Sequence, residues 1–241
     1  MKVLTLDAGN TRTKYHLFDS DAITSSGILE KAEDLPELLK KTNPEKIGLC
    51  SVNPIATDKI KLSIPEKYAQ VVIEVSSSSR MNFHLEYDTP ETLGNDRICS
   101  AAGALHLAPF DDLIFVIDSG TCITVNIIAD KIYKGGIIAP GIDTMLKSMH
   151  DYTGSLPLLE KYMPEYIQGR NTRDAMMSGV IILLKGIEQY LELNAKHYAR
   201  KAKIFITGGN GLFLKDVLQL DAIYKENLVA LGIRMLVKLN S

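Results

Sequence analysis

The chain has 241 residues, 46% of them hydrophobic, and its 27 basic and 29 acidic side chains leave a net charge of −2. This length suits one large domain or two of about 120 residues, with a normal hydrophobic core. A nearly neutral chain gives no electrostatic case for binding nucleic acid or an anionic membrane. No apolar run approaches the roughly 18 residues that a membrane span needs, and no basic segment with a hydrophobic signal core opens the chain.

The three cysteines, Cys50, Cys99 and Cys122, lie far apart and form no CxxC pair. This spacing argues against a zinc site and a disulfide framework, and it favours reduced thiols in a cytoplasmic protein. We therefore expect the cysteines to be small buried hydrophobic side chains rather than nucleophiles.

The first expected element is a strand that ends in a polar turn. An apolar run over residues 3–6 reaches Asp7, the chain turns through Gly9, and apolar residues resume at Tyr15. Glycine allows backbone angles that a Cβ forbids and lets a ligand approach the main chain. Backbone N–H groups, two threonine hydroxyls and the Lys14 ammonium form a cradle of the kind that phosphates occupy, and a carboxylate such as Asp7 suits hydrated Mg²⁺. The alternative is a hairpin with an ordinary polar turn.

Strands and helices alternate through the rest of the first half. The pattern predicts strands over 23–29, 46–51 and 71–75, and helices over 35–41 and 57–64. The order is then β-β-β-α-β-α-β.

A loop containing Pro90 and Gly94 comes next along the chain. An Ala-rich segment with apolar residues at helical spacing follows, which predicts a helix from near Asn95 to residue 107. Asp96 and Arg97 would lie in the first turn of this helix.

A second strand–turn–strand unit begins near the middle of the chain. Residues 113–117 predict a buried strand that ends in Asp118-Ser119-Gly120-Thr121, with strand character continuing to residue 128. Like the segment around Asp7, it has an apolar strand end, an Asp, a small residue, a Gly and a hydroxyl-bearing turn. The two segments are 111 residues apart. This indicates an internal duplication in which each half supplies one phosphate-facing turn.

The second half continues in the same order. We expect a strand over 131–139 broken at Gly135-Gly136, a helix over 143–150, a loop over 153–164, an amphipathic helix from 172 to about 200, a strand over 203–207 and a helix over 226–239. The strand over 203–207 runs into Gly208-Gly209-Asn210-Gly211, which suits a third ligand contact. The whole pattern predicts an α/β fold with domains at 1–110 and 111–241.

Four segments together resemble a known family: Asp7-x-Gly9-Asn10-Thr11-x-x-Lys14, Gly94-x-Asp96-Arg97, Asp118-x-Gly120-Thr121 and Thr207-Gly208-Gly209. In this order and spacing they resemble type III pantothenate kinase, of the acetate and sugar kinase/Hsp70/actin superfold. The resemblance covers almost the whole chain, although residues 23–82 carry no motif. It implies two ribonuclease-H-like (actin-like ATPase) domains with the ligand cleft between them, and a homodimer.

The resemblance also implies a phosphotransferase activity with an alcohol as acceptor. The reaction would be ATP-dependent phosphorylation of pantothenate to 4′-phosphopantothenate, at the start of coenzyme A biosynthesis. The implied cofactors are Mg²⁺ and a monovalent cation, K⁺ or NH₄⁺, with ATP as co-substrate.

Matched positions imply three sets of site residues. The ATP set is Asp7, Ala8, Gly9, Asn10, Thr11, Arg12, Thr13, Lys14 and Thr121. The substrate set is Tyr87, Gly94, Asn95, Asp96, Arg97 and Thr172. The cation set is Asp118 for the monovalent ion and Asp7 for Mg²⁺ through water. Without the resemblance, Tyr87 and Thr172 would be interpreted as a loop aromatic and a helix N-cap.

Asp96 is the candidate base for the proton of the pantothenate hydroxyl. An Asp in the first turn of a helix is stabilised as an anion, which makes it a weak base. A weak base is sufficient, because the transition state of phosphoryl transfer is usually loose and the alcohol proton leaves late. Arg97 would clamp polar groups of the substrate. The alternative is helix capping by Asp96 with a surface salt bridge from Arg97.

Two other functions compete with this one. The first is a kinase or ATPase on the same fold that acts on another small molecule, such as a sugar or acetate. The Gly94-x-Asp96-Arg97 segment and the short chain count against it. The second is a non-catalytic regulatory or accessory homologue, against which the intact Asp7, Lys14, Asp96 and Asp118 argue.

Overall fold

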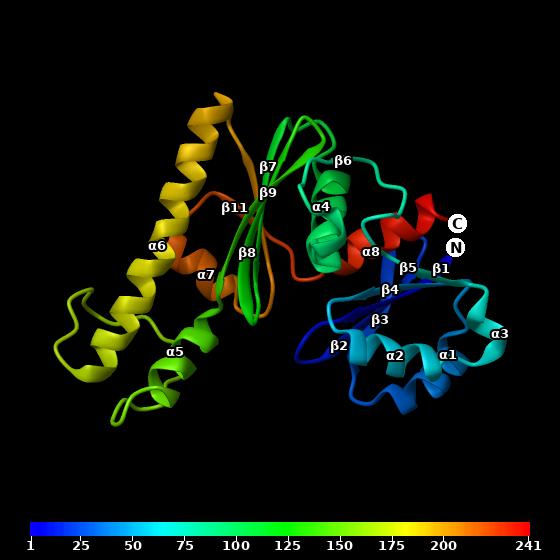
Figure 1. Ribbon diagram of the computed structural model, residues 1–241, viewed down its shortest axis with the longest axis horizontal. Helices are drawn as coiled ribbons and strands as arrows, with labels where there is room; N and C mark the ends of the chain where they lie inside the picture. Colours follow the sequence, from blue (N-terminus) through cyan, green and yellow to red (C-terminus); the bar gives the residue numbers. More distant parts are fainter. The chain divides into compact units, whose positions relative to one another are not determined.

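The computed structural model describes residues 1–241 as two units, each built around its own β-sheet (Figure 1). The first unit comprises Met1–Pro109, Lys131–Tyr133 and Asn227–Ser241, and the second comprises Phe110–Asp130 and Lys134–Glu226. The predicted α/β class is therefore confirmed. The predicted domain limits, 1–110 and 111–241, stay a prediction, although the C-terminal segment packs with the first unit.

The first unit has a five-stranded sheet in the order β3-β2-β1-β4-β5. Its elements are β1 (Lys2–Ala8), β2 (Thr13–Asp19), β3 (Ala22–Leu29), η1 (Ala32–Asp34), α1 (Leu35–Thr42), β4 (Lys46–Ser51), α2 (Pro54–Leu62), α3 (Glu66–Ala69), β5 (Val72–Glu74), β6 (His84–Leu85), η2 (Pro90–Thr92), α4 (Asn95–Leu107) and α8 (Leu228–Leu239). The central strand β1 pairs antiparallel with β2 and parallel with β4.

Helices cover both faces of this sheet, which explains the apolar run in β1. Leu4 and Leu6 pack with α1, α2 and α3 on one face, while the alternate residue Val3 is also fully buried. A strand buried on both faces is apolar at nearly every position. On the second face α8 lies directly on β4, because a Cβ at Gly48 would be 2.5 Å from Cγ2 of Ile233.

α4 and α8 meet backbone to backbone at two glycines. A Cβ at Gly232 would lie 1.7 Å from the carbonyl oxygen of Cys99, and one at Gly103 would lie 2.4 Å from that of Leu228. Small residues at a helix crossing allow the two axes to approach closely. The first turn of α4, which carries Asp96, is therefore fixed to a rigid support.

The second unit repeats the topology of the first. Its elements are β7 (Leu113–Ser119), β8 (Cys122–Ala129), β9 (Ile132–Pro140), α5 (Ile142–Asp151), α6 (Thr172–Tyr198), β10 (Lys203–Thr207), α7 (Gly211–Leu218) and β11 (Ala222–Tyr224). Its sheet has the order β11-β10-β7-β8-β9-β6, and the run β9-β8-β7-β10-β11 matches β3-β2-β1-β4-β5 in order. The directions of the β7–β8, β7–β10 and β10–β11 pairings match those of β1–β2, β1–β4 and β4–β5. The internal duplication expected from the two Asp-x-Gly turns is thus visible in the sheets.

A single apolar core lies between this sheet and its helices (Figure 1). Phe115 and Ile117 of β7 belong to it, together with Met177 and Leu184 of α6 and Leu214 of α7. Met176 and Met177 of α6 are buried in this core. No helix combines the length and the apolar character that crossing a bilayer demands.

The expected elements are confirmed except at short or glycine-containing segments. The strand over 131–139 was expected to break at Gly135-Gly136, which is wrong: β9 is continuous from Ile132 to Pro140. A Cβ at Gly136 would lie 1.7 Å from the carbonyl oxygen of Val125, so this glycine admits the neighbouring strand instead of ending its own. The short elements α3, β6 and β11 were missed, since two to four residues show no periodicity, and no range was predicted for the eight-residue helix α7.

The α4–α8 contact gives the first prediction. Gly232→Ala should lower the free energy of unfolding of the first unit by about 1–3 kcal/mol, because the added methyl group must displace the Cys99 backbone. Urea denaturation followed by circular dichroism measures the change. Gly154→Ala is the control, since a Cβ there meets nothing within 4 Å. Equal stability of the two variants would contradict the contact.

Candidate functional site

The first Asp-x-Gly turn joins β1 and β2. It is closed by a hydrogen bond in which Gly9 N donates to Arg12 O over 3.2 Å. Asp7 and Lys14 are partners across the hairpin, while the tip residues Asn10 and Thr11 are exposed. The turn therefore presents its polar side chains and one ammonium group at the end of the strand pair, as the phosphate-cradle interpretation requires.

Asp7 and Asp96 form a pair of partly buried carboxylates within the first unit. Burial raises the pKa of Asp7 to about 6, and the charge of Asp96 raises it further against the opposing effect of Lys14. Two carboxylates that share a site resist ionising together. The pair is thus a local concentration of negative charge that a cation or a proton relieves.

The pKa of Asp96 is raised, chiefly by burial. Three effects oppose the shift: the backbone N–H of Arg97, which donates to Oδ1 of Asp96 over 2.8 Å, the Arg97 charge, and the backbone N–H of Asp96 itself. The expectation that Asp96 is a weak base because of its place in the first turn is therefore wrong, since its pKa is raised. Loss of water around the carboxylate outweighs the stabilisation that the helix start provides.

The start of α4 is built to hold the Asp96 carboxylate. A Cβ at Gly94 would lie 2.5 Å from Oδ1 of Asp96, so only glycine leaves room for the carboxylate there. Asn95 Nδ2 donates to the carbonyl oxygen of Ser51 over 3.0 Å, which fixes the helix start to the end of β4. No side chain caps this helix, so the capping role considered for Asp96 is not observed.

Arg97 is buried instead of lying at the surface, with only 5% of its area exposed. Its Cζ atom lies 5.8 Å from the ring centroid of Tyr133. The Tyr133 ring also meets Tyr87 edge-on, with the centroids 6.1 Å apart. The structure thus brings the expected substrate residues Tyr87 and Arg97 together on the ring of Tyr133, a residue that sequence reasoning missed. Its only signal was an aromatic residue at the start of a predicted strand.

The second Asp-x-Gly turn, in the other unit, packs against a glycine-rich turn. Gly208 has a φ of +90, and a Cβ there would lie 2.4 Å from Oδ1 of Asp118. Asn210 N donates to the carbonyl oxygen of Ser119 over 2.9 Å. The hydroxyl of Ser119 is buried without a hydrogen-bond partner. Asp118 and the segment proposed for a third ligand contact are therefore adjacent.

Thr121 follows this turn and is held through its backbone. Its carbonyl oxygen accepts hydrogen bonds from Gly141 N at 2.9 Å and from the Thr144 hydroxyl at 2.7 Å. The start of α5 thereby fixes the turn that carries Asp118 and Thr121.

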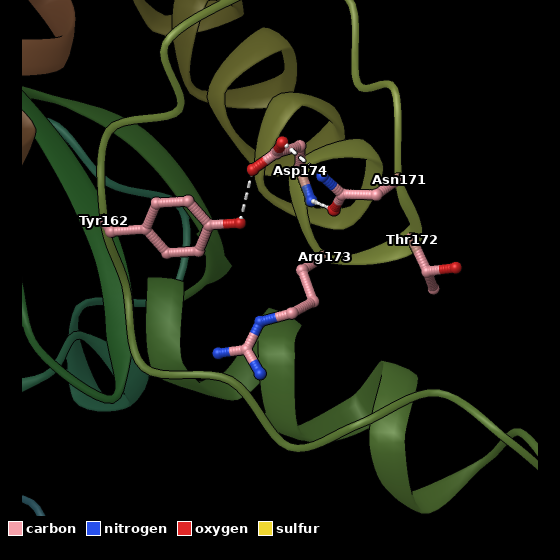
Figure 2. Close-up of a pocket in the computed structure, with 5 residues that line it drawn as sticks. All are labelled: Tyr162, Asn171, Thr172, Arg173 and Asp174. Atoms are coloured by element: carbon pink, nitrogen blue, oxygen red, sulfur yellow. Dashed lines mark hydrogen bonds between the residues drawn. The ribbon is translucent and has the colours of Figure 1, made fainter.

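A cavity of about 640 Å³ lies at the start of α6, lined by Tyr162, Asn171, Thr172, Arg173 and Asp174 (Figure 2). Asn171, and not Thr172, caps the helix by accepting from Asp174 N over 2.9 Å. The Tyr162 hydroxyl donates to Oδ1 of Asp174 over 2.7 Å. Figure 2 shows the Thr172 hydroxyl pointing away from this hydrogen-bonded group, so it is available to a ligand.

The residues proposed for cations supply too few ligands to hold an ion unaided. No group of three or more His, Cys, Asp or Glu side chains is placed to bind a metal. A carboxylate such as Asp7, beside a second carboxylate, still fits hydrated Mg²⁺, which keeps several waters and takes further ligands from phosphates. Asp118 offers a carboxylate oxygen to a cation, and the backbone of Gly208 packs closely beside it, since a Cβ there would lie 2.4 Å from Oδ1.

Two thiols lie behind the carboxylate pair. Cys50 is the β-partner of Asp7, Cys99 lies one turn after Asp96, and both are fully buried as expected. Their mutual hydrogen bond and burial raise the pKa of Cys50, and burial raises that of Cys99. Cys122 is exposed, so the expectation of burial is wrong for this residue, which begins β8 beside the second turn.

Two sheets of one topology, each with an Asp-x-Gly turn between its first two strands, define a kinase fold of the actin-like class. In agreement, the ROK hexokinase from Thermus thermophilus is similar over 98% of each chain, with a TM-score of 0.54 and 14% identity. A structure from Campylobacter jejuni, described as a conserved putative Baf family transcriptional activator, has a TM-score of 0.64 and 25% identity over 98% of this chain and 97% of its own.

The family model for type III pantothenate kinase matches residues 3–192. A type III pantothenate kinase from Chlorobaculum parvum is 30% identical, over 99% of this chain and 95% of its own length. One from Flavobacterium johnsoniae is 34% identical, over 90% of this chain and 89% of its own. The chain belongs to the type III pantothenate kinase family.

The raised pKa of Asp7 predicts a pH-dependent effect of its removal. The folded chain binds this proton more tightly than the unfolded chain, so ionisation of Asp7 costs stability as the pH rises from about 4 through about 6. Asp7→Asn should therefore gain up to about 3 kcal/mol relative to wild type between pH 4 and pH 7.5.

Urea denaturation at the two pH values, with a chelator present, measures this gain. Asp19→Asn, at the exposed end of β2, is the control. A pH-independent difference for Asp7→Asn would show that the carboxylate is solvated.

Proposed function

We propose that this chain phosphorylates pantothenate with ATP to give 4′-phosphopantothenate, the first step of coenzyme A biosynthesis. The observation that carries the proposal is the Asp7–Asp96 pair, in which two carboxylates at matched family positions are near enough to shift one pKa. Family membership supplies the substrate. The reduced, adjacent thiols of Cys50 and Cys99 support a cytoplasmic location.

Asp96 accepts the proton of the acceptor hydroxyl as the oxygen attacks the γ-phosphate. A carboxylate whose pKa is raised by burial is a better base near neutral pH than an exposed one. Phosphoryl transfer otherwise asks the protein mainly for positioning and charge neutralisation. The fixed start of α4 provides the positioning, since Gly94 and Asn95 hold the carboxylate of Asp96 in place.

ATP is held at the two Asp-x-Gly turns. Asn10, Thr11 and Lys14 bind phosphate oxygens at the exposed end of the β1–β2 hairpin, and Thr121 contacts ATP beside the second turn. The remaining positions of the first turn, Ala8, Gly9, Arg12 and Thr13, complete this contact with backbone and side chain.

Two cations complete the proposed site. Asp7 would orient the waters of Mg²⁺, and Asp118 would supply a carboxylate oxygen to K⁺ or NH₄⁺. Bound Mg²⁺ would offset phosphate charge and so favour the transfer. In an activity assay, either removing Mg²⁺ or replacing K⁺ by Na⁺ should reduce turnover.

Pantothenate is bound through Tyr87, Arg97 and Thr172, with Gly94 and Asn95 shaping the start of α4. The buried Arg97 guanidinium suits a substrate anion, because charge-assisted hydrogen bonds are strongest where water is excluded. Pantothenate carries a carboxylate at the end remote from the hydroxyl that is phosphorylated.

An ATP-coupled assay with pantothenate, acetate and a panel of sugars tests this function. Wild type should turn over pantothenate alone, and Asp96→Asn should lose at least about 100-fold in kcat, since general-base catalysis contributes about 10²–10⁴. Binding of ATP, measured by calorimetry, should be unchanged. Asp88→Asn, an exposed position in the preceding loop, is the matched control. Turnover of another alcohol, or no turnover, would instead favour the alternative kinase or the regulatory homologue.

A homodimer is the second part of the proposal, supported by the outer side of α6. Ile182, Leu183 and Leu193 lie on one stripe of this helix and are 57%, 68% and 58% exposed. Gly179 and Gly186 belong to the same stripe, and a Cβ at either meets nothing within 4 Å. The opposite side of α6 is buried in the core of its own unit. An exposed apolar stripe of this kind marks a surface for protein association, and a second α6 packed at the glycines covers it here.

Leu183→Glu should convert the dimer to a monomer, because it places a charge within the proposed apolar interface. Light scattering after size exclusion measures the mass. Leu212→Glu is the control, since Leu212 is an exposed leucine, 58% exposed, on α7 of the same unit. A monomeric wild type, or an unchanged mass for Leu183→Glu, would reject this interface.

A further inference from the structure

Tyr133 is a fully buried side chain to which neither the family match nor the proposed mechanism gives a role. It lies at the start of β9, in a three-residue segment that joins the first unit although the chain on both sides belongs to the second. Its backbone anchors the loop that leads to Tyr87, because Glu86 N donates to the Tyr133 carbonyl oxygen over 3.0 Å.

The Tyr133 ring contacts two side chains from two other segments. Arg97, in the first turn of α4, places its Cζ atom 5.8 Å from the ring centroid. Tyr87, in the loop before η2, meets the ring edge-on at an interplanar angle of 64°. Both neighbours belong to the set proposed to bind pantothenate, so one ring links them.

These contacts restrict the rotamers of Arg97, the side chain proposed to bind the substrate anion. An arginine has many rotamers, and a guanidinium that must bind an anion works best when few remain open. A ring face within about 6 Å attracts the cation, and the attraction grows when water is excluded. With Arg97 only 5% exposed, that condition is met. The edge-on contact similarly limits the orientations of Tyr87.

We propose that Tyr133 is a positioning residue for the acceptor: its ring holds Arg97 and Tyr87 in the arrangement that binds the pantothenate anion. The inference rests on the proposed function and deepens it, since it makes affinity for the acceptor depend on a residue that does not touch it. The ring contacts Arg97 and Tyr87, so we expect removal of the ring to affect binding of the acceptor more than binding of ATP.

Steady-state kinetics of two substitutions test the proposal. Tyr133→Leu removes the ring and should raise KM for pantothenate at least about fivefold, in line with the strength of a desolvated cation–π contact. KM for ATP should stay within about twofold, and kcat should fall by less than KM for pantothenate rises. Tyr133→Phe keeps the ring and should restore KM for pantothenate, because both contacts involve the ring.

A matched control separates positioning from a loss of stability. Tyr68 is another buried tyrosine of the first unit, 5% exposed, whose hydroxyl donates to the Leu39 carbonyl oxygen at 2.9 Å. Tyr68→Leu should lower the melting temperature and leave KM for pantothenate unchanged. If Tyr133→Leu fails to fold, Tyr133→Met fills the site without a ring and replaces it in the comparison.

The outcomes distinguish the positioning role of Tyr133 from the proposed phosphorylation of pantothenate on which it rests. An active wild type whose KM for pantothenate is unaffected by Tyr133→Leu, or raised equally by Tyr68→Leu, overturns the positioning role alone. A wild type that does not phosphorylate pantothenate overturns the proposed function and the inference together. An increase in KM that is confined to pantothenate and reversed by Tyr133→Phe supports it.

Discussion

The burial of two neighbouring carboxylates, Asp7 and Asp96, is the constraint on which the rest of the first unit depends. Each loses water on folding, and the charge of Asp96 also disfavours the ionised form of Asp7. Lys14 across the hairpin and the Arg97 backbone and charge offset only part of this. Such an arrangement persists only where its surroundings are rigid. The tie from Asn95 to Ser51 and the glycine contact between α4 and α8 provide that rigidity.

The two units share the backbone path around the Asp-x-Gly turn, but the groups around its Asp differ between them. In both units a strand ends in Asp, turns through glycine and returns antiparallel, and a parallel strand follows on the other side. Asp7 faces a second carboxylate and a pair of thiols, whereas Asp118 faces the bare backbone at Gly208. One ancestral bend has thus acquired two electrostatic environments, which is what two chemically distinct cations would require.

Most of the fold could be predicted because its signals are local. Continuous apolar runs at β1 and β7 predict strands that are buried on both faces, and the repeated Asp-x-Gly turn indicates the duplication. The direction of the Asp96 pKa shift could not be predicted, because the burial that sets it comes from packing absent from the helix's own sequence. The role of Tyr133 could not be predicted for the same reason, since its ring contacts Arg97 and Tyr87, which are distant along the chain.

The packing of α8 against α4 also sets the order in which the two units can finish folding during translation. The second unit is continuous from Phe110 to Glu226 apart from three residues, so nearly all of it leaves the ribosome before α8 exists. The first unit, although it emerges before the second, lacks α8 until that helix is translated, and Gly103 and Cys99 stay uncovered until then. Domains usually mature from the N-terminus onward. Here a helix that follows the second unit completes the first, so the unit that carries the two carboxylates is the later one to become stable.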